Sequence, residues 1–388
     1  MAFRLKGAML AGAAILYGAL VLGNGSDRLS AVSPGIERLV PGPFRSSAAV
    51  AAGSYAVAEK DFAAAERHAA RGIAASPLNR EAIGLLAVSR LMQDKADAAD
   101  AAFRVSGQLG WRDLPTQLYW YQVGLDSGDD TLVAQRADAV LRTNPDYAEA
   151  LRLLQPLEST PARRDALIGR LVERPDWLDR YPHPGKDVGD AQLRDRALVL
   201  TGLAARHVRL GCDAIADMAG QLVDRGMRDE SLALWKAQCG RSQSASGLFD
   251  PDFQGLAANR PSPFAWRVYA SGDVDVRAAN TADGTLATAI ANASSFPLPV
   301  LRQSVVLAPG SWRVKIAVVD PAAARGKMFV SVGCGADDGR HGNTMGDPAG
   351  AGQVITVPDC PRQGFAIWMA PQSDSVTLRR ITLERTGS

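Results

Sequence analysis

A repeated segment constrains the fold of the first half of this chain more than any other feature does. The segment SPLNREAIGLL at Ser76–Leu86 aligns with NPDYAEALRLL at Asn144–Leu154, and their prolines, Pro77 and Pro145, are separated by two periods of 34 residues. A fixed period of about 20 to 50 residues is typical of a solenoid, in which each unit packs only on its neighbours. The sequence therefore predicts stacked pairs of helices.

Small side chains recur at positions where the two helices of such a pair would approach closely. If Pro77 closes one unit, the next unit has the aromatic Phe103 in its second helix and Trp111 in place of the closing proline. The small positions of these two units are Gly53, Ala65, Gly72, Ala87 and Ala99. In its period and in these positions, the segment 44–154 resembles the tetratricopeptide repeat family. The resemblance implies a groove that binds a protein partner.

The composition of the chain changes sharply at two places. From Phe44 the sequence is rich in Ala and favours helix, and from Ser242 it is dominated by Val, Thr, Ser, Gly and Pro. Beyond the repeated segments the period fades, but amphipathic stretches continue at 160–173, 190–210, 211–226 and 228–239. We therefore predict a multidomain chain, α then β, with a helical solenoid similar to tetratricopeptide repeats at 44–241 and an antiparallel β-sandwich at 242–388.

Short stretches of alternating apolar and polar residues predict the strands of the second half. The expected strands lie at 264–269, 274–278, 285–291, 302–307, 312–318, 328–332, 353–357, 365–369 and 375–384. The segment VVLAPGSWRVKIAV predicts a hairpin that turns at Pro309-Gly310. Many short strands separated by turns are typical of a β-sandwich.

Three features of this half carry a further resemblance. They are FDPDFQG followed by PFAWRV, the L-x-P-G-S-W turn, and the closing strand LRRITLER. In these segments the half resembles the galactose-binding-like jelly rolls that occur as carbohydrate-binding modules. The resemblance implies a jelly roll with a glycan site, in which an aromatic ring stacks on the sugar and polar neighbours bond its hydroxyls. The candidate residues for glycan binding are Trp266, Arg267 and Trp368.

A second aromatic cluster lies in the helical half. The segment LYWYQ contains Tyr119, Trp120 and Tyr121 in succession. Consecutive residues span most of the circumference of a helix, so these three rings cannot all face one core. We expect at least one of them to line a groove that binds a protein partner, whereas packing between helices is the structural alternative for each ring.

The N-terminal segment has the charge pattern of an export signal. Arg4 and Lys6 precede an uncharged stretch at 7–25, and polar sequence follows. The stretch is short for a bilayer crossing, which takes about 17 to 25 residues. We predict a signal anchor or signal peptide at 1–25, favouring the uncleaved anchor, and a linker at 26–43. Both alternatives export the rest of the chain, and the favoured anchor would lie in the inner membrane of a bacterial-type envelope with the bulk of the chain in the periplasm.

The four cysteines agree with export from the cytoplasm. Cys212 and Cys239 are close in sequence within the predicted helical domain, and Cys334 and Cys360 are close within the β domain. In an exported protein such pairs predict disulfides, and four cysteines allow three connectivities, of which the local one joins residues within domains. Zinc is the alternative, but C-x-x-C and H-x-x-x-H spacings do not accompany these cysteines.

The glycine-rich stretch SVGCGADDGRHGNTMGDPAGAGQVITVPDC contains the second cysteine pair. It does not match a phosphate-binding loop, because G-x-x-x-x-G-K-[ST] is missing. We predict a surface loop whose base is closed by Cys334 and Cys360. Calcium binding is the alternative, with oxygens from Asp337, Asp338, Asn343 and Asp347, although the acidic residues do not have EF-hand spacing.

Charge and motifs argue against several classes of function. Lys and Arg number 43 and Asp and Glu 41, so the net charge of +2 gives no general attraction to nucleic acid. The four histidines are not part of H-E-x-x-H, and G-x-S-x-G and S-x-x-K do not occur. We therefore expect no enzyme activity, no cofactor, no metal and no nucleic-acid partner.

These features together predict an exported, non-catalytic adaptor or scaffold. It would act in the assembly or export of a cell-envelope component, and the resemblance of the β half implies that this component is a polysaccharide. The solenoid would bind an envelope protein partner and the jelly roll a glycan. Two alternatives remain: a protein-only scaffold of a secretion or division complex, and a glycan-modifying enzyme whose catalytic residues are dispersed in the sequence.

Overall fold

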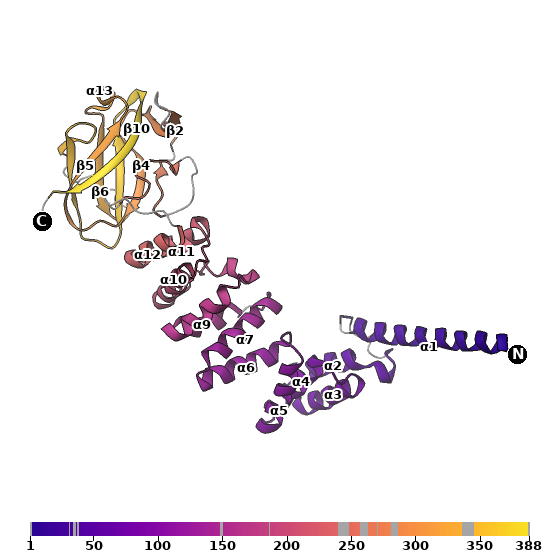
Figure 1. The fold of residues 1–388 in the computed structure, drawn as a ribbon. Coiled ribbons are helices and arrows are strands. Elements are labelled where there is room, and N and C mark those ends of the chain that lie inside the picture. Colours follow the sequence, from indigo (N-terminus) through magenta and orange to yellow (C-terminus); the bar gives the residue numbers. More distant parts are fainter. Residues whose placement is uncertain are drawn as a thin grey trace. The chain divides into compact units, whose positions relative to one another are not determined.

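The computed structural model divides into two compact units, 1–157 (unit 1) and 158–388 (unit 2). The residues it describes are 2–30, 32–33, 36, 39–147, 150–185, 187–239, 248–256, 263–269, 271–280, 286–335 and 345–386. Unit 1 is helical, and unit 2 contains helices followed by two antiparallel β-sheets (Figure 1). The predicted order of a helical region and then a β region is therefore confirmed.

Three helical pairs follow the first helix of unit 1, and they repeat with the predicted 34-residue period. The first helices of the pairs are α2 (Ser46–Ala58), α4 (Arg80–Leu91) and α6 (Leu114–Ser127). The second helices are α3 (Phe62–Ala75), α5 (Ala96–Gln108) and α7 (Asp130–Thr143). Short 3-10 turns, η2 (Gly42–Phe44) and η3 (Ala150–Leu154), flank the pairs, and α8 (Gln155–Glu158) follows.

Polar side chains at the N-caps begin most of these helices. Four N-cap residues accept a hydrogen bond from a backbone N–H in the first turn of α3, α4, α6 and α7. They are Asp61, Asn79, Asp113 and Asp129. A cap of this kind contributes about 1 kcal/mol, because it satisfies a backbone donor that has no partner within the helix.

The small residues of the repeat lie where helices approach closely, as predicted. A Cβ added to Gly53 in α2 would overlap the side chain of Leu85 in α4, and one added to Gly72 in α3 would stand 3.1 Å from the Cβ of Ala82. Ala65, Ala87 and Ala99 are completely buried. Larger side chains at these positions would separate the helices, so the repeat positions are packing positions.

The first helix, α1 (Ala2–Ser30), continues past residue 25 into the stretch predicted as a linker. Its last turns contact the first helical pair. The Asp27 carboxylate accepts hydrogen bonds from the backbone N–H groups of Ser47 and Ala48, at 2.9 and 3.0 Å, and so caps α2. The ring of Phe44 lies against Gly23. Among the described residues, no helix is both long and apolar enough to cross a bilayer.

Unit 2 begins with four helices at the positions where amphipathic stretches were predicted. They are α9 (Pro161–Leu171), α10 (Asp190–Ala205), α11 (Cys212–Asp224) and α12 (Arg228–Cys239), with the 3-10 turn η4 (Asp176–Arg180) between the first two. The buried carboxylate of Glu158 connects this region: it accepts hydrogen bonds from Arg196 at 2.7 Å, from the Tyr181 hydroxyl at 2.9 Å and from Gln192 at 3.1 Å.

The β region of unit 2 is a sandwich of two antiparallel sheets. One sheet has the order β1-β4-β9-β6 and the other the order β2-β3-β10-β5-β8-β7. The strands are β1 (Arg267–Val268), β2 (Val274–Asn280), β3 (Leu286–Asn292), β4 (Leu298–Val305), β5 (Gly310–Val318), β6 (Met328–Cys334), β7 (Met345–Asp347), β8 (Gly352–Val357), β9 (Gln363–Met369) and β10 (Gln372–Arg385). A single apolar core contains residues of both sheets, including Leu301, Ile367, Ile316 and Leu378.

Each predicted strand has a counterpart, but the predicted hairpin at Pro309-Gly310 is wrong. β4 and β5 lie in different sheets, so they do not pair with each other. The chain leaves the first sheet at Leu307, whose backbone N–H and C=O are both bonded to the Gln363 side chain, at 2.8 and 3.0 Å. Apolar alternation is the same for a strand that pairs with its neighbour and for one that crosses to the facing sheet, so the local pattern could not distinguish them.

One predicted disulfide is present and the other is not. Cys334 and Cys360 are bonded, with their Cα atoms 6.0 Å apart. Cys212, the first residue of α11, is a half-buried free thiol, so the predicted bond to Cys239 is not formed. The end of this helical pair is held instead by the buried side chain of Gln238, which accepts from the Leu210 N–H at 2.8 Å and donates to a carbonyl of α10.

Candidate functional site in the cleft beside helix α11

Two adjoining hollows of about 320 and 360 Å³ lie between helix α11 and the four-stranded sheet of unit 2. They share four lining residues and together form one open cleft, which we call the α11 cleft. The shared residues are Gly220, Asp224, Pro263 and Arg267. Binding sites for small molecules have volumes of about 300 to 1,000 Å³, so the cleft has room for a ligand of one or two sugar rings.

The sheet wall of the cleft carries two arginines on adjacent strands. Arg267 of β1 stands directly opposite Arg302 of β4 in the antiparallel register, and both line the cleft together with Ser304. The guanidinium of Arg302 lies 5.5 Å from the ring of Tyr269, which follows β1. This register places two positive charges and their hydrogen-bond donors on one wall of the cleft. Like charges directly opposite each other in a sheet repel, so the pairing has a cost in stability.

The helix wall of the cleft carries carboxylates. Asp213, Asp217 and Asp224 all come from α11 and line the hollow. The first two are four residues apart, so they lie on the same side of the helix. Asp217 accepts a hydrogen bond from Gln221 at 3.1 Å. Donors on the sheet wall therefore face acceptors on the helix wall.

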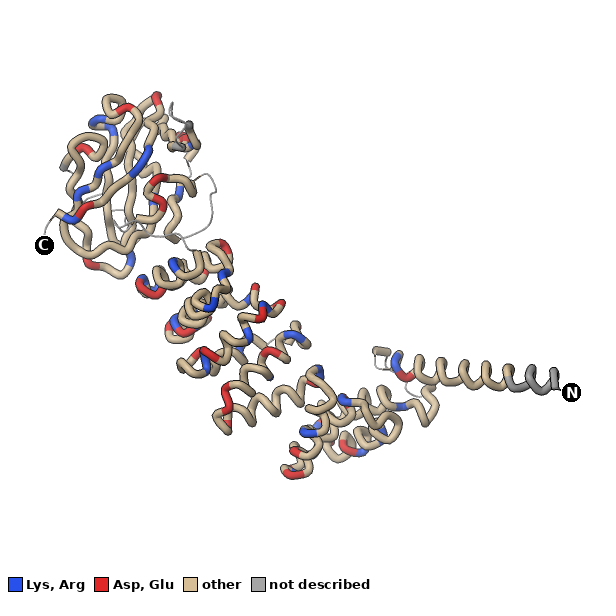
Figure 2. Tube along the Cα trace, in the orientation of Figure 1, with Lys and Arg blue, Asp and Glu red and all other residues tan. Residues whose placement is uncertain are grey.

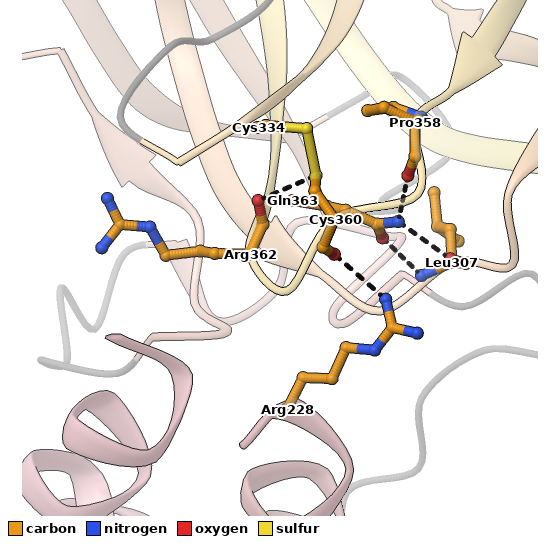
Figure 3. Close-up of a disulfide and its surroundings, with 7 residues drawn as sticks. All are labelled: Arg228, Leu307, Cys334, Pro358, Cys360, Arg362 and Gln363. Carbon is orange, nitrogen blue, oxygen red and sulfur yellow. Dashed lines mark hydrogen bonds between the residues drawn. A yellow bond between two sulfur atoms is a disulfide. The ribbon is translucent and has the colours of Figure 1, made fainter. Parts of the chain in front are cut away.

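Contacts between the turn before β9 and helices α11 and α12 hold these walls together. Arg362 donates to the Asp224 carboxylate at 2.6 Å, and Arg228 of α12 donates to the carbonyl of Cys360 at 3.2 Å. Figure 3 shows Arg228 reaching from the start of its helix to Cys360, beside the disulfide to Cys334. The disulfide therefore fixes the turn through which the sheet contacts the helices.

Of the three residues predicted to bind glycan, only Arg267 lies in the cleft. Trp266 is 4% exposed, packs against Phe253 and donates from its ring nitrogen to the carbonyl of Asp250 at 2.9 Å. Trp266 and Arg267 are neighbours in an extended segment, so their side chains point to opposite faces, and the indole is the one that enters the core. The predicted stacking role of Trp266 is therefore corrected to core packing.

Trp368 is also buried. It is 3% exposed, stacks on Phe329 with ring centroids 5.4 Å apart, and donates from its ring nitrogen to the Ser331 hydroxyl at 2.8 Å. Burial on this scale leaves no ring face for a sugar. A half-buried aromatic side chain, Tyr269, lies beside Arg302 instead.

The predicted protein-binding cluster in unit 1 packs between helices. Tyr119 stacks on Phe103 with ring centroids 4.0 Å apart, and its hydroxyl donates to Asp100. Burial and this hydrogen bond raise the pKa of Tyr119 to about 12. Trp120 is half-buried, and its ring nitrogen donates to a carbonyl of α5 at 3.3 Å. Tyr121 is 6% exposed and donates to the carbonyl of Leu153.

A different aromatic residue is exposed in unit 1. Trp111 is 46% exposed, and the guanidinium of Arg136 lies 4.2 Å from its ring. Arg136 also donates to the Gln117 side chain at 3.0 Å. In the sequence, Trp111 stands in place of the proline that closes the other units. By itself this substitution indicates a departure from the repeat and does not indicate an exposed ring.

Neither a metal site nor a comparison with known proteins assigns a function to this chain. Among the residues that the structure describes, no group of three or more His, Cys, Asp or Glu side chains is placed to hold a metal ion. Asp337, Asp338 and Asn343, considered for calcium, lie outside the described residues, and Asp347 accepts from the backbone N–H of Ala349. No protein-family model and no curated protein matches this chain.

Proposed function

We propose that this chain is an exported, non-catalytic adaptor of the cell envelope that binds polysaccharide in the α11 cleft. Its helical pairs bind an envelope protein partner, and α1 anchors it in the inner membrane with the bulk of the chain in the periplasm. The observation that carries the proposal is the cleft itself, in which Arg267 and Arg302 face the carboxylates of Asp217 and Asp224.

A sugar fits this arrangement because each hydroxyl group both donates and accepts a hydrogen bond. The guanidinium of Arg267 offers donors only, and an ionised aspartate offers acceptors only, so a ligand between the walls must satisfy both kinds of group. A purely anionic ligand would be repelled by Asp217, and a purely cationic one by Arg267 and Arg302; Asp224 is already paired with Arg362. A polyhydroxylated ligand satisfies both walls.

The anchoring role rests on α1. Large apolar side chains are exposed on every side of this helix from Leu10 onward: Leu10, Ile15, Leu16, Tyr17, Leu20, Val21 and Leu22. In Figure 2 the coloured part of α1 carries no charged residue until its last turns. A helix that is apolar all round belongs in a core or a membrane, and the preceding Arg4 and Lys6 fit the cytoplasmic side of an anchor.

The resemblances to two families support the proposal at the level of fold. The 34-residue period of the helical pairs supports a tetratricopeptide-like solenoid in unit 1. The two facing antiparallel sheets support a jelly roll of the galactose-binding-like kind in unit 2. The polysaccharide as the specific ligand comes from this second resemblance, together with the polar lining of the α11 cleft.

The test is calorimetric titration of the full chain in detergent with polysaccharide from the envelope of its native host. Arg267→Ala should weaken saturable binding about tenfold or more, because a hydrogen bond to a charged group contributes about 1.5 to 3 kcal/mol. Arg277→Ala is the matched control, since Arg277 is an exposed arginine on β2 of the other sheet. Binding that Arg267→Ala leaves unchanged would move the glycan away from the cleft.

A protein-only scaffold is the second candidate, and one observation favours it. Trp111, with Arg136 over its ring, presents an exposed Trp–Arg pair, and these residue types are enriched where protein partners bind. A photo-crosslinker placed at Trp111 should then capture a single envelope protein in the native host. If wild-type chain binds no polysaccharide but this crosslink forms, the protein-only scaffold replaces the glycan adaptor.

A further inference from the structure

A groove of about 520 Å³ lies in the first helical pair of unit 1. Its walls are mainly alanine side chains of α2 and α3, and its polar residues are all cationic or imidazole groups. The lining residues are Gly42, Pro43, Arg45, Ala48, Ala49, Ala52, His68, Arg71, Ala74 and Ala75. Asp and Glu are missing from the described residues that line it. The groove therefore combines a small apolar floor with positive charge.

The electrostatics of His68 agree with this description. Burial lowers the pKa of His68 below its ordinary value, and the nearby Arg71 and Arg67 lower it further, while Asp61 acts in the opposite direction. A positive potential of this kind favours an anionic group in the groove.

The groove is held close to the point where the apolar part of α1 ends. Asp27 bonds the backbone N–H of Ala48, and Ala48 lines the groove. The last exposed apolar residue before this contact is Leu22, and a helix rises 1.5 Å per residue, so Leu22 and Asp27 are separated by about 7 to 8 Å along α1. If α1 is inserted in a bilayer up to Leu22, the groove lies at the level of the lipid headgroups.

We propose that this groove binds the phosphate-bearing headgroup of an anionic phospholipid beside the anchor. The proposal rests on the membrane anchoring given under the proposed function, but it is independent of the glycan site. Arg71 supplies a planar guanidinium group, whose geometry matches phosphate oxygens. Arg45 also lines the groove, and its Nε donates to the carbonyl of Val40. His68 supplies a third donor, and the alanine walls accommodate the glycerol carbons. Phosphatidylglycerol, with one negative charge and a small polar head, is the probe that fits these requirements.

The binding test uses native mass spectrometry of the full chain in detergent, with phosphatidylglycerol or phosphatidylcholine added. We expect preferential retention of phosphatidylglycerol, and Arg71→Gln should weaken its binding about fivefold, as is usual for one basic residue at an anionic lipid surface. Arg67→Gln is the matched control, since Arg67 lies one turn away on α3 but does not line the groove. Equal binding of both lipids, or no effect of Arg71→Gln, would overturn the proposal.

A second readout separates the lipid from other anions. In bilayer nanodiscs, phosphatidylglycerol should raise the pKa of His68, followed by nuclear magnetic resonance of its labelled ring. If inorganic phosphate or a polyglutamate peptide gives the same rise without lipid, the groove is a site for that anion and the lipid assignment is wrong. Co-sedimentation of the full chain with phosphatidylcholine vesicles tests the anchor alone. Loss of co-sedimentation would therefore contradict the proposed anchoring without deciding the chemistry of the groove.

Discussion

The buried ion pair between Glu158 and Arg196 offers a sharp test of how unit 2 is held together. The two side chains are 1% and 6% exposed and meet at 2.7 Å. The Arg196 guanidinium also lies 4.9 Å from the ring of Tyr181, whose hydroxyl donates to the same carboxylate oxygen. Burial would by itself lower the pKa of Arg196, but Glu158 raises it above its ordinary value, so the guanidinium keeps its charge.

Arg196→Met removes the positive charge but leaves an apolar side chain of similar length. Among the described residues, the Glu158 carboxylate then keeps Tyr181 and Gln192 as donors. Burial raises the pKa of Tyr181 well above its ordinary value, so the phenol remains a neutral donor. Removing one partner of a buried pair costs about 3 to 5 kcal/mol, because the remaining charge is desolvated without compensation. We expect a loss of this size for Arg196→Met.

The double variant Glu158→Gln/Arg196→Met separates the charge effect from lost packing. Because it removes both charges, it should be less destabilised than the sum of the single variants by at least about 1 kcal/mol. Arg206→Met is the control, since Arg206 pairs with Asp165 at 3.9 Å on the surface, where such pairs contribute about 0 to 1 kcal/mol.

The assay is hydrogen exchange of the full chain, read from peptides of α10, where Arg196 lies. Exchange reports the local free energy of opening, which a whole-chain melting curve would average over both units. A change below about 1 kcal/mol in Arg196→Met, or an equal change in Arg206→Met, would refute the view that this pair fastens unit 2.

Two further predictions concern pH and redox state. Lys95 and Arg90 hydrogen bond to the Glu66 carboxylate and lower its pKa from 4.5 to about 2. A carboxyl group whose pKa is lowered by folding stabilises the folded protein at pH values above its pKa in the unfolded state. Glu66→Gln should therefore weaken the hydrogen-exchange protection of α3 at neutral pH. The difference between this variant and wild type should disappear as the pH falls from 4.5 to about 2. The disulfide predicts the redox state of Cys334 and Cys360. In protein isolated from the envelope and denatured without reductant, both thiols should resist alkylation, which mass spectrometry of the peptides measures. Labelling of both cysteines would contradict an oxidising compartment.

The helical repeat was predictable because it is a local, periodic signal. Close approach of two helices demands a small residue at a fixed place in each unit, and Gly53 and Ala87 satisfy that demand one period apart. The strands were likewise visible from alternation. The sheet assignment of β4 and β5 was not, because it depends on long-range pairing that alternation alone does not encode.

The site was predictable only in part for a similar reason. The sequence placed Trp266 and Arg267 on opposite faces of one strand, but which face meets the core depends on the packing of both sheets. Arg302 becomes part of the site because its strand pairs with β1. The aspartates of α11 become part of it because Arg362 contacts Asp224. These residues are far apart in sequence, so no local motif joins them.

The central claim is that a polysaccharide occupies the α11 cleft, and hydrogen exchange with and without envelope polysaccharide tests it most directly. We expect slower exchange in α11 and at the paired residues Arg267 and Arg302 of β1 and β4, with no change in α4 to α7 of unit 1. Unchanged exchange in α11, β1 and β4 at saturating polysaccharide, or protection confined to unit 1, would contradict it.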